Sequence, residues 1–135
     1  MPVLVKWIPK VLRLEPPASA AQLDALASTL GLELPDDYRA LLCEANGVLA
    51  NLVVFYPVEE VPERNATFAV AANASGHILI GCVNDFPLLL RTGRESPVFQ
   101  NDWGDMTLDC MYQLGTSLAE WIRRGCPESE GKTAE

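Results

Sequence analysis

The chain of 135 residues is 49% hydrophobic and 21% charged, which is typical of a single globular domain and disfavours intrinsic disorder. Its 18 acidic and 10 basic residues give a formal net charge of −8, which disfavours direct binding to nucleic acid or anionic lipid. No segment approaches the roughly 18 apolar residues of a membrane span, and no signal-peptide pattern opens the chain. We therefore expect a cytoplasmic protein with one domain over residues 1–125 and a flexible acidic tail over 126–135.

The first 18 residues fit two local structures. Val3–Val5 suits a strand, whereas apolar residues in this segment also recur at helical spacing. Pro9 removes a backbone donor from that helical pattern, and Pro16 with Pro17 ends the segment, so both alternatives remain open. The residues at helical spacing are Leu4, Trp7, Ile8, Val11 and Leu12.

A first amphipathic helix is predicted between Ser19 and Gly31. Ser19 and Gln22 form a capping-box pattern, in which each side chain accepts a hydrogen bond from the backbone of the other residue. Gly31 ends the helix, because glycine readily adopts the left-handed conformation of a helix terminus. The apolar stripe between them, at i, i+3, i+4 and i+7, comprises Leu23, Leu26, Ala27 and Leu30.

A second helix is predicted within the stretch "LPDDYRALLCEANG", residues 34–47. Pro35 suits the first turn, and Asp36 and Asp37 place negative charge at the positive end of the helix dipole. Asn46-Gly47 supplies a left-handed exit. The two helices are joined by a short connection and predict a helical hairpin whose apolar faces need a further layer. The apolar stripe of the second helix comprises Tyr38, Leu41, Leu42 and Ala45.

Beyond residue 47 short apolar runs predict strands of a mostly antiparallel sheet with about four to six strands. A short helix around Phe68 is expected between the first two runs, and Ser117 with Glu120 opens a final helix that Gly125 ends. This order of helices, strands and a closing helix predicts an α+β fold. The predicted strands cover residues 52–56, 77–83, 87–92 and 96–102.

The four cysteines indicate a reducing environment. Cys43, Cys82, Cys110 and Cys126 show no CxxC spacing, and the first three lie in apolar surroundings, where a thiol behaves as a small buried hydrophobe. Reduced thiols are therefore the favoured interpretation. An even number of cysteines also allows two disulfides, although a chain of this length and apolar content does not need them.

Catalytic side chains are scarce. His77 is the single histidine, which leaves no multi-histidine zinc site, and it begins a predicted strand. A Cys/His dyad remains the alternative to a strand-end histidine. The glycines are separated by strands and form no phosphate-binding loop, and two short glycosylation-type sequons carry no meaning in a cytoplasmic protein. The sequence predicts no catalytic, cofactor-binding or metal-binding residue, and no cofactor.

An acidic loop follows the last predicted strand. Asp102, Asp105 and Asp109 lack the order of a calcium-binding loop. Two interpretations remain: a solvated polar loop, or an acidic recognition edge in which Trp103 is the aromatic anchor.

The order of these motifs resembles the SUKH superfamily, which joins fungal cell-wall regulators of the Smi/Knr type to bacterial immunity proteins. Residues 23–47 resemble the family's first helix, its "LP-x-D/E-Y" turn, its second helix and its "NG" exit. The resemblance continues through "ILIG" (78–81), "SPVFQND" (96–102) and "TSLAEWI" (116–122), and it covers about residues 20–125. Leu118 and Trp121 stand where the family usually has phenylalanine. The resemblance implies a scaffold role for the stretch at 34–47.

For function, the resemblance implies a non-catalytic immunity protein that binds and neutralises a cognate toxin domain, and a monomer is favoured. The charge of −8 suits a basic, nucleic-acid-acting toxin. The alternative is a regulatory or scaffold module of the Smi/Knr type without a toxin partner, and an enzyme using His77 is a third hypothesis. The candidate partner-binding residues, in loops beside the predicted strands, are Asp85, Glu95, Asp102, Trp103, Asp105 and Asp109.

Overall fold

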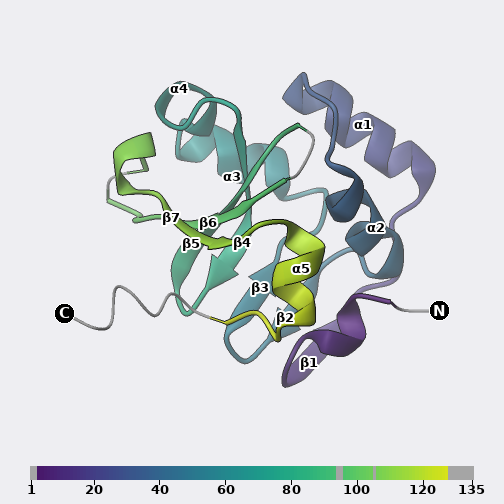
Figure 1. The fold of residues 1–135 in the computed structure, drawn as a ribbon. Helices are drawn as coiled ribbons and strands as arrows, with labels where there is room; N and C mark the ends of the chain where they lie inside the picture. The colour runs from purple at the N-terminus through teal and green to yellow at the C-terminus, as the bar shows by residue number, and fades with distance from the viewer. Residues whose placement is uncertain (1–2, 94–95, 105, 128–135) are drawn as a thin grey trace.

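A computed structural model describes residues 3–93, 96–104 and 106–127 and shows an α+β domain (Figure 1). Within these residues no helix has the length and apolar character needed to cross a bilayer. The helices are η1 (Val5–Trp7), α1 (Ala20–Leu30), α2 (Asp36–Glu44), α3 (Val61–Thr67), α4 (Val70–Asn73), η2 (Leu108–Cys110) and α5 (Leu118–Arg123). The strands are β1 (Val11–Leu14), β2 (Val48–Ala50), β3 (Val53–Phe55), β4 (His77–Val83), β5 (Phe86–Arg91), β6 (Val98–Gln100) and β7 (Tyr112–Gly115).

The sheet is a meander. In the described residues seven strands pair in chain order, from β1 to β7, and every neighbouring pair is antiparallel. The predicted α+β class and antiparallel pairing are confirmed, but the predicted four to six strands are too few. The strands that the sequence did not predict are β1, β2 and β7. Each has three or four residues, which is too short for an alternating pattern to be recognised.

Helices α1 and α2 lie close to their predicted positions. Ser19 and Gln22 form the predicted capping box, with N–O distances of 3.1 and 2.8 Å. Pro35 is the N-cap of α2 and lies just before its first turn. The predicted hairpin packing of the two helices is not confirmed, because α1 packs mainly against α3 and α2 mainly against α5 (Figure 1).

The connection between β3 and β4 holds two short helices where one was predicted around Phe68. Phe68 lies between α3 and α4, and Ala69 next to it has φ of +50°. The buried Asn65 amide donates to the Leu79 carbonyl at 2.9 Å and accepts from the Leu79 N–H at 2.9 Å. Asn65 therefore extends the hydrogen bonding of β4 beyond the end of β3.

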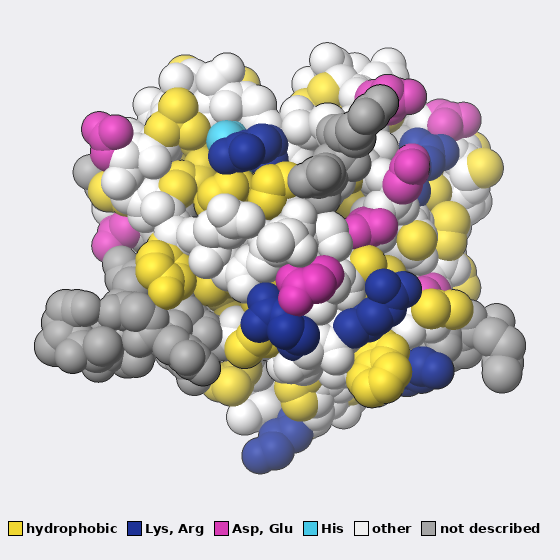
Figure 2. Space-filling view, viewed as in Figure 1, with side chains coloured by type: hydrophobic (Ala, Val, Ile, Leu, Met, Phe, Trp, Pro, Cys, Tyr) yellow, Lys and Arg dark blue, Asp and Glu magenta, His cyan; other side chains and the backbone are white. Residues whose placement is uncertain are grey.

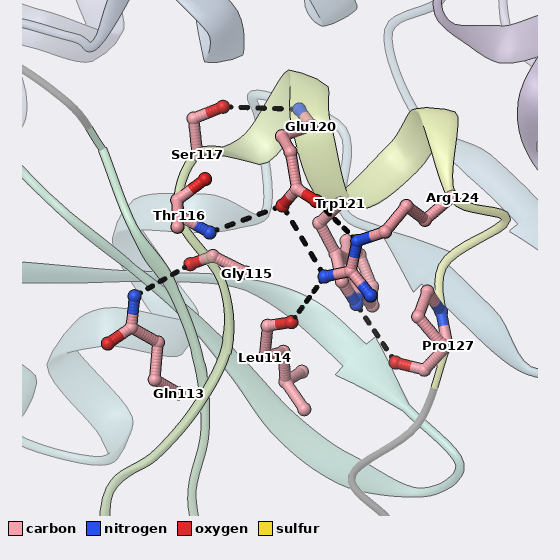
Figure 3. A network of polar contacts seen from close by, with 9 residues as sticks. All are labelled: Gln113, Leu114, Gly115, Thr116, Ser117, Glu120, Trp121, Arg124 and Pro127. Atoms are coloured by element: carbon pink, nitrogen blue, oxygen red, sulfur yellow. Dashed lines mark hydrogen bonds and ion pairs between the residues drawn. The ribbon is translucent and has the colours of Figure 1, made fainter.

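The closing helix α5 is tied to α2. The Asp37 carboxylate accepts a hydrogen bond from the Ala119 N–H at 3.0 Å, so an acidic residue of α2 caps the N-terminus of α5. The Trp121 side chain is fully buried, and its indole N–H donates to the Pro127 carbonyl at 2.9 Å (Figure 3). Arg124 pairs with Glu120 and donates to the Leu114 carbonyl at 2.7 Å (Figure 3).

The cysteines are free, as the reduced interpretation predicts. Their environments differ from the expectation, however, because Cys43 is exposed on α2 and Cys126 is buried beside α5. Burial raises the pKa of Cys126 to about 12, so its thiol stays protonated at neutral pH. Packed chain thus continues to Pro127, and residues 128–135 of the predicted tail lie outside the described residues.

Candidate functional site

The two faces of the sheet differ in their coverage. Residues paired directly across antiparallel strands share a face. Val48, Phe55 and Leu88 belong to one such row, which we call the covered row, and each is at most 3% exposed. The neighbouring row, which we call the open row, is Arg13, Leu49, Val54 and Cys82. Leu49 in this row is 45% exposed, so the sheet has an uncovered apolar region at its β1–β3 end.

A groove of about 560 Å³ lies over the open row. Leu49, Val54 and Tyr56 contribute its apolar floor. One wall comes from the β1 side and carries Arg13 and Glu15, and the opposite wall comes from Glu59 and Glu60 with Arg64 of α3. The groove therefore combines an apolar floor with charged walls, which is the usual make-up of a binding pocket.

Both guanidinium groups of the groove already have partners. Arg13 Nε lies 2.6 Å from Glu15 Oε2, and the Arg64 guanidinium lies 3.1 Å from Glu60 Oε1. Arg64 also stacks on the Tyr56 ring, with 4.5 Å between the guanidinium carbon and the ring centroid. Arg64 thus fixes the orientation of Tyr56 at the α3 wall.

Cys82 pairs with Val54 of the groove floor and lies near the end of β4, before the turn between β4 and β5. Burial raises the pKa of the Cys82 thiol, and the nearby Asp85 carboxylate raises it further, whereas Arg64 lowers it. Burial also raises the pKa of Tyr56, and Cys82 is the next cause. Asp85 follows Cys82 by three residues, in the turn after β4.

Trp103 lies at this turn and contacts residues from two other segments of the chain. Its indole N–H donates to the Asp85 carbonyl at 2.7 Å, and its ring packs on Phe68 with 5.0 Å between centroids. The side chain nevertheless stays 36% exposed. Asp85 adopts φ of +67° in the tight β4–β5 turn, and Asp102 Oδ1 accepts from the Gly104 N–H at 2.8 Å. We call Phe68, Asp85, Asp102 and Trp103 the Trp103 corner.

The structure brings three of the six predicted partner-binding residues together. Asp85, Asp102 and Trp103 form the corner, and Asp109 is exposed on the short helix η2. Glu95 and Asp105 lie outside the described residues. Among the residues described, no group of three or more His, Cys, Asp or Glu could hold a metal ion.

His77 and Cys82 stand near opposite ends of β4, five residues apart, or roughly 17 Å at about 3.3 Å per residue. This separation leaves no Cys/His dyad between them. His77 Nδ1 instead lies 2.9 Å from the Ser75 carbonyl, and the His77 ring meets the Phe99 ring edge-on with 5.4 Å between centroids.

The groove was not predicted from the sequence. Leu49, Tyr56 and Arg64 come from β2, the end of β3 and α3, and they meet only through strand pairing and helix placement. A local signal existed at one position: Glu60 and Arg64 have the i, i+4 spacing of a helical ion pair.

Residues 17–124 match the SMI1 / KNR4 family (SUKH-1). No curated protein matches the chain significantly. The matched residues run from just before α1 into the end of α5 and include the groove's α3 wall and the Trp103 corner. The chain therefore belongs to the SMI1 / KNR4 (SUKH-1) family.

Proposed function

We propose that this domain is a non-catalytic cytoplasmic immunity protein, which binds a cognate toxin domain and neutralises it. Family membership and the net charge of −8 support a protein-binding role with a basic, nucleic-acid-acting toxin as partner. The observation that carries the proposal is Trp103, an exposed aromatic side chain that is hydrogen-bonded to Asp85 and packed on Phe68.

Trp103 has the properties of an interface anchor. Tryptophan is enriched among residues that dominate binding energy, and a side chain already held in place loses little conformational freedom on binding. The carboxylates of Asp85 and Asp102 belong to the Trp103 corner, and Asp109 follows on η2. None of the three forms an ion pair with a described residue. They can therefore attract basic groups of a partner.

Figure 2 shows Lys and Arg side chains among the Asp and Glu side chains on the face in view, so this face is not uniformly negative. We therefore expect a basic partner to be recognised by a local group of carboxylates. The Trp103 corner supplies two exposed carboxylates, Asp85 and Asp102.

A second candidate function is a regulatory or scaffold module of the Smi/Knr type that has no toxin partner. The groove at the β1–β3 end favours this candidate, because a preformed groove can accept segments of many proteins.

The test is growth rescue in a bacterium that expresses the toxin domain encoded beside this gene. Co-expression should restore growth, and the two proteins should co-purify. Trp103→Ala, or the double change Asp85→Lys with Asp102→Lys, should weaken binding at least tenfold, because each removes the anchor or reverses the local charge.

The control is Asp24→Lys with Glu33→Lys, which changes the net charge equally at exposed positions on and after α1. It also breaks the 3.6 Å surface ion pair between Asp24 and Arg39, and exposed pairs of this kind contribute little to stability. This control should retain rescue. Equal loss of binding in both double variants would contradict the placement at the corner. A toxic neighbour that is neither bound nor rescued would contradict the immunity function and favour the regulatory module.

A further inference from the structure

We propose that the groove binds an extended segment of the partner protein, with an apolar side chain on Leu49 and Val54 and a Lys or Arg side chain beside Glu59. This inference rests on the proposed function only in that the partner is a protein. It adds a second contact surface, which neither the family match nor the Trp103 corner assigns.

The apolar contact follows from the exposure of Leu49. Its neighbours along β2, Val48 and Ala50, are 3% and 4% exposed, whereas Leu49 is 45% exposed. Val54 pairs directly with Leu49 and is only half-buried. Two adjacent aliphatic side chains on the floor of a groove gain from being covered, and a segment of a partner protein can cover them.

The groove is preformed. Its Pro16 wall is held by the Asn46 N–H, which donates to the Pro16 carbonyl at 2.9 Å. The Asn46 side chain in turn accepts from the Val58 N–H at 2.8 Å and fixes the opposite wall. Pro17 and Pro57 also line the groove, and their ring-locked backbones stiffen it. A rigid groove lowers the entropic cost of binding.

The choice of a cation follows from the charges of the walls. Glu15 and Glu60 are paired with Arg13 and Arg64, respectively. The third carboxylate, Glu59, is exposed, and its hydrogen bond in the described structure comes from the neutral Gln22 side-chain amide at 3.1 Å. Three carboxylates against two guanidinium groups leave one negative charge in the groove. An incoming Lys or Arg side chain balances it.

The first test uses two blocked heptapeptides, one alternating Val with Lys and the other alternating Val with Glu. Amide chemical shifts of the intact protein are followed by NMR during titration. The Lys peptide should shift the amides of Leu49, Val54 and Tyr56 and should bind at least fivefold more tightly than the Glu peptide. Equal binding of both peptides, or shifts elsewhere only, would overturn the proposal.

Variants locate the contact. Glu59→Gln should weaken binding of the Lys peptide at least threefold, and Leu49→Ser should weaken binding of both peptides. Glu33→Gln is the matched control, because Glu33 is exposed and lies outside the groove, and it should change nothing. If Glu59→Gln binds the Lys peptide as tightly as the original protein does, Glu59 does not bind the cation, and the proposal is contradicted.

Failure of the groove and failure of the immunity function are distinguishable. Growth rescue that depends on Trp103 but persists in Leu49→Ser with Glu59→Lys would contradict the groove as a partner site and leave the immunity function intact. Lys-peptide binding in the groove without any rescue would support the groove and contradict the toxin as its partner.

Discussion

The covered row and the open row occupy the same strands, one residue apart, yet they have different surroundings. Phe55 of the covered row is 1% exposed, whereas Val54 beside it in β3 is only half-buried. Side chains alternate between the two faces of a strand, so a strand of three residues can contribute to the core and to a surface at once. The comparison indicates that substitutions at alternate residues of one strand can change stability and binding separately.

The largest expected effect is the loss of stability in Phe55→Ala. Removing a buried aromatic side chain leaves a cavity and should lower the free energy of unfolding by about 3–5 kcal/mol. Leu49→Ala removes an exposed side chain and should cost less than about 1 kcal/mol. Urea denaturation followed by circular dichroism measures both, and equal losses would contradict the distinction between the two rows.

Gly81 of β4 lies directly against the backbone of β3. A Cβ added at Gly81 would lie 1.8 Å from the Val54 carbonyl oxygen, so Gly81→Ala should lower the free energy of unfolding by about 3 kcal/mol. Gly104→Ala is the control, because its Cβ would meet Asp102 Oδ1 at 3.4 Å, an ordinary contact. An almost unchanged free energy of unfolding in Gly81→Ala would show that the two strands can separate easily.

The buried Tyr38 of α2 provides a second test of the stability of the core. Its hydroxyl is fully buried with no hydrogen-bond partner among the described residues, and burial raises its pKa. Tyr38→Phe should therefore raise the free energy of unfolding by about 1 kcal/mol, since it removes an unsatisfied polar group without leaving a large cavity. A lower stability, measured by the same denaturation, would reveal a partner for the hydroxyl.

The smallest effect concerns the open row. The thiolate is the reactive form of cysteine, and the Asp85 carboxylate contributes to the raised pKa of Cys82. Asp85→Asn removes this negative charge, so the pKa should fall and alkylation by iodoacetamide at pH 8 should become roughly two- to fourfold faster. Asparagine also tolerates the positive φ of this turn.

Peptide mass spectrometry separates Cys82 from the other thiols. Asp102→Asn serves as the control, because Asp102 is not among the causes that raise the pKa of Cys82. Equal acceleration in both variants would show that the effect comes from loosening of the Trp103 corner and not from the charge of Asp85.

Local signals in the sequence predicted much of the scaffold. The capping box at Ser19 and Gln22 marked the start of α1, and the apolar run at 77–83 coincides with β4. These elements depend on neighbouring residues, so their pattern is visible in the chain. Strand β1 carries no clear alternating pattern, because three of its four residues are exposed and a bulge interrupts its register with β2.

The candidate site was less accessible to sequence analysis. The acidic loop predicts either a solvated loop or a recognition edge with Trp103 as its aromatic anchor. The contacts of Trp103 with Phe68 and Asp85 depend on segments 35 and 18 positions earlier in the chain, and no local pattern encodes them. The role of these residues in binding stays a prediction.

The bond between Asp37 and Ala119 has a consequence for the order of folding. Each strand of the sheet pairs with the next along the chain, so strand pairing closes only the connection between consecutive strands. The Asp37 bond instead closes a loop of 82 residues, and long-range contacts form late because closing a long loop is costly in entropy. We expect a nascent chain that ends before residue 118 to lack this closure, with α2 left open to chaperones until synthesis is complete.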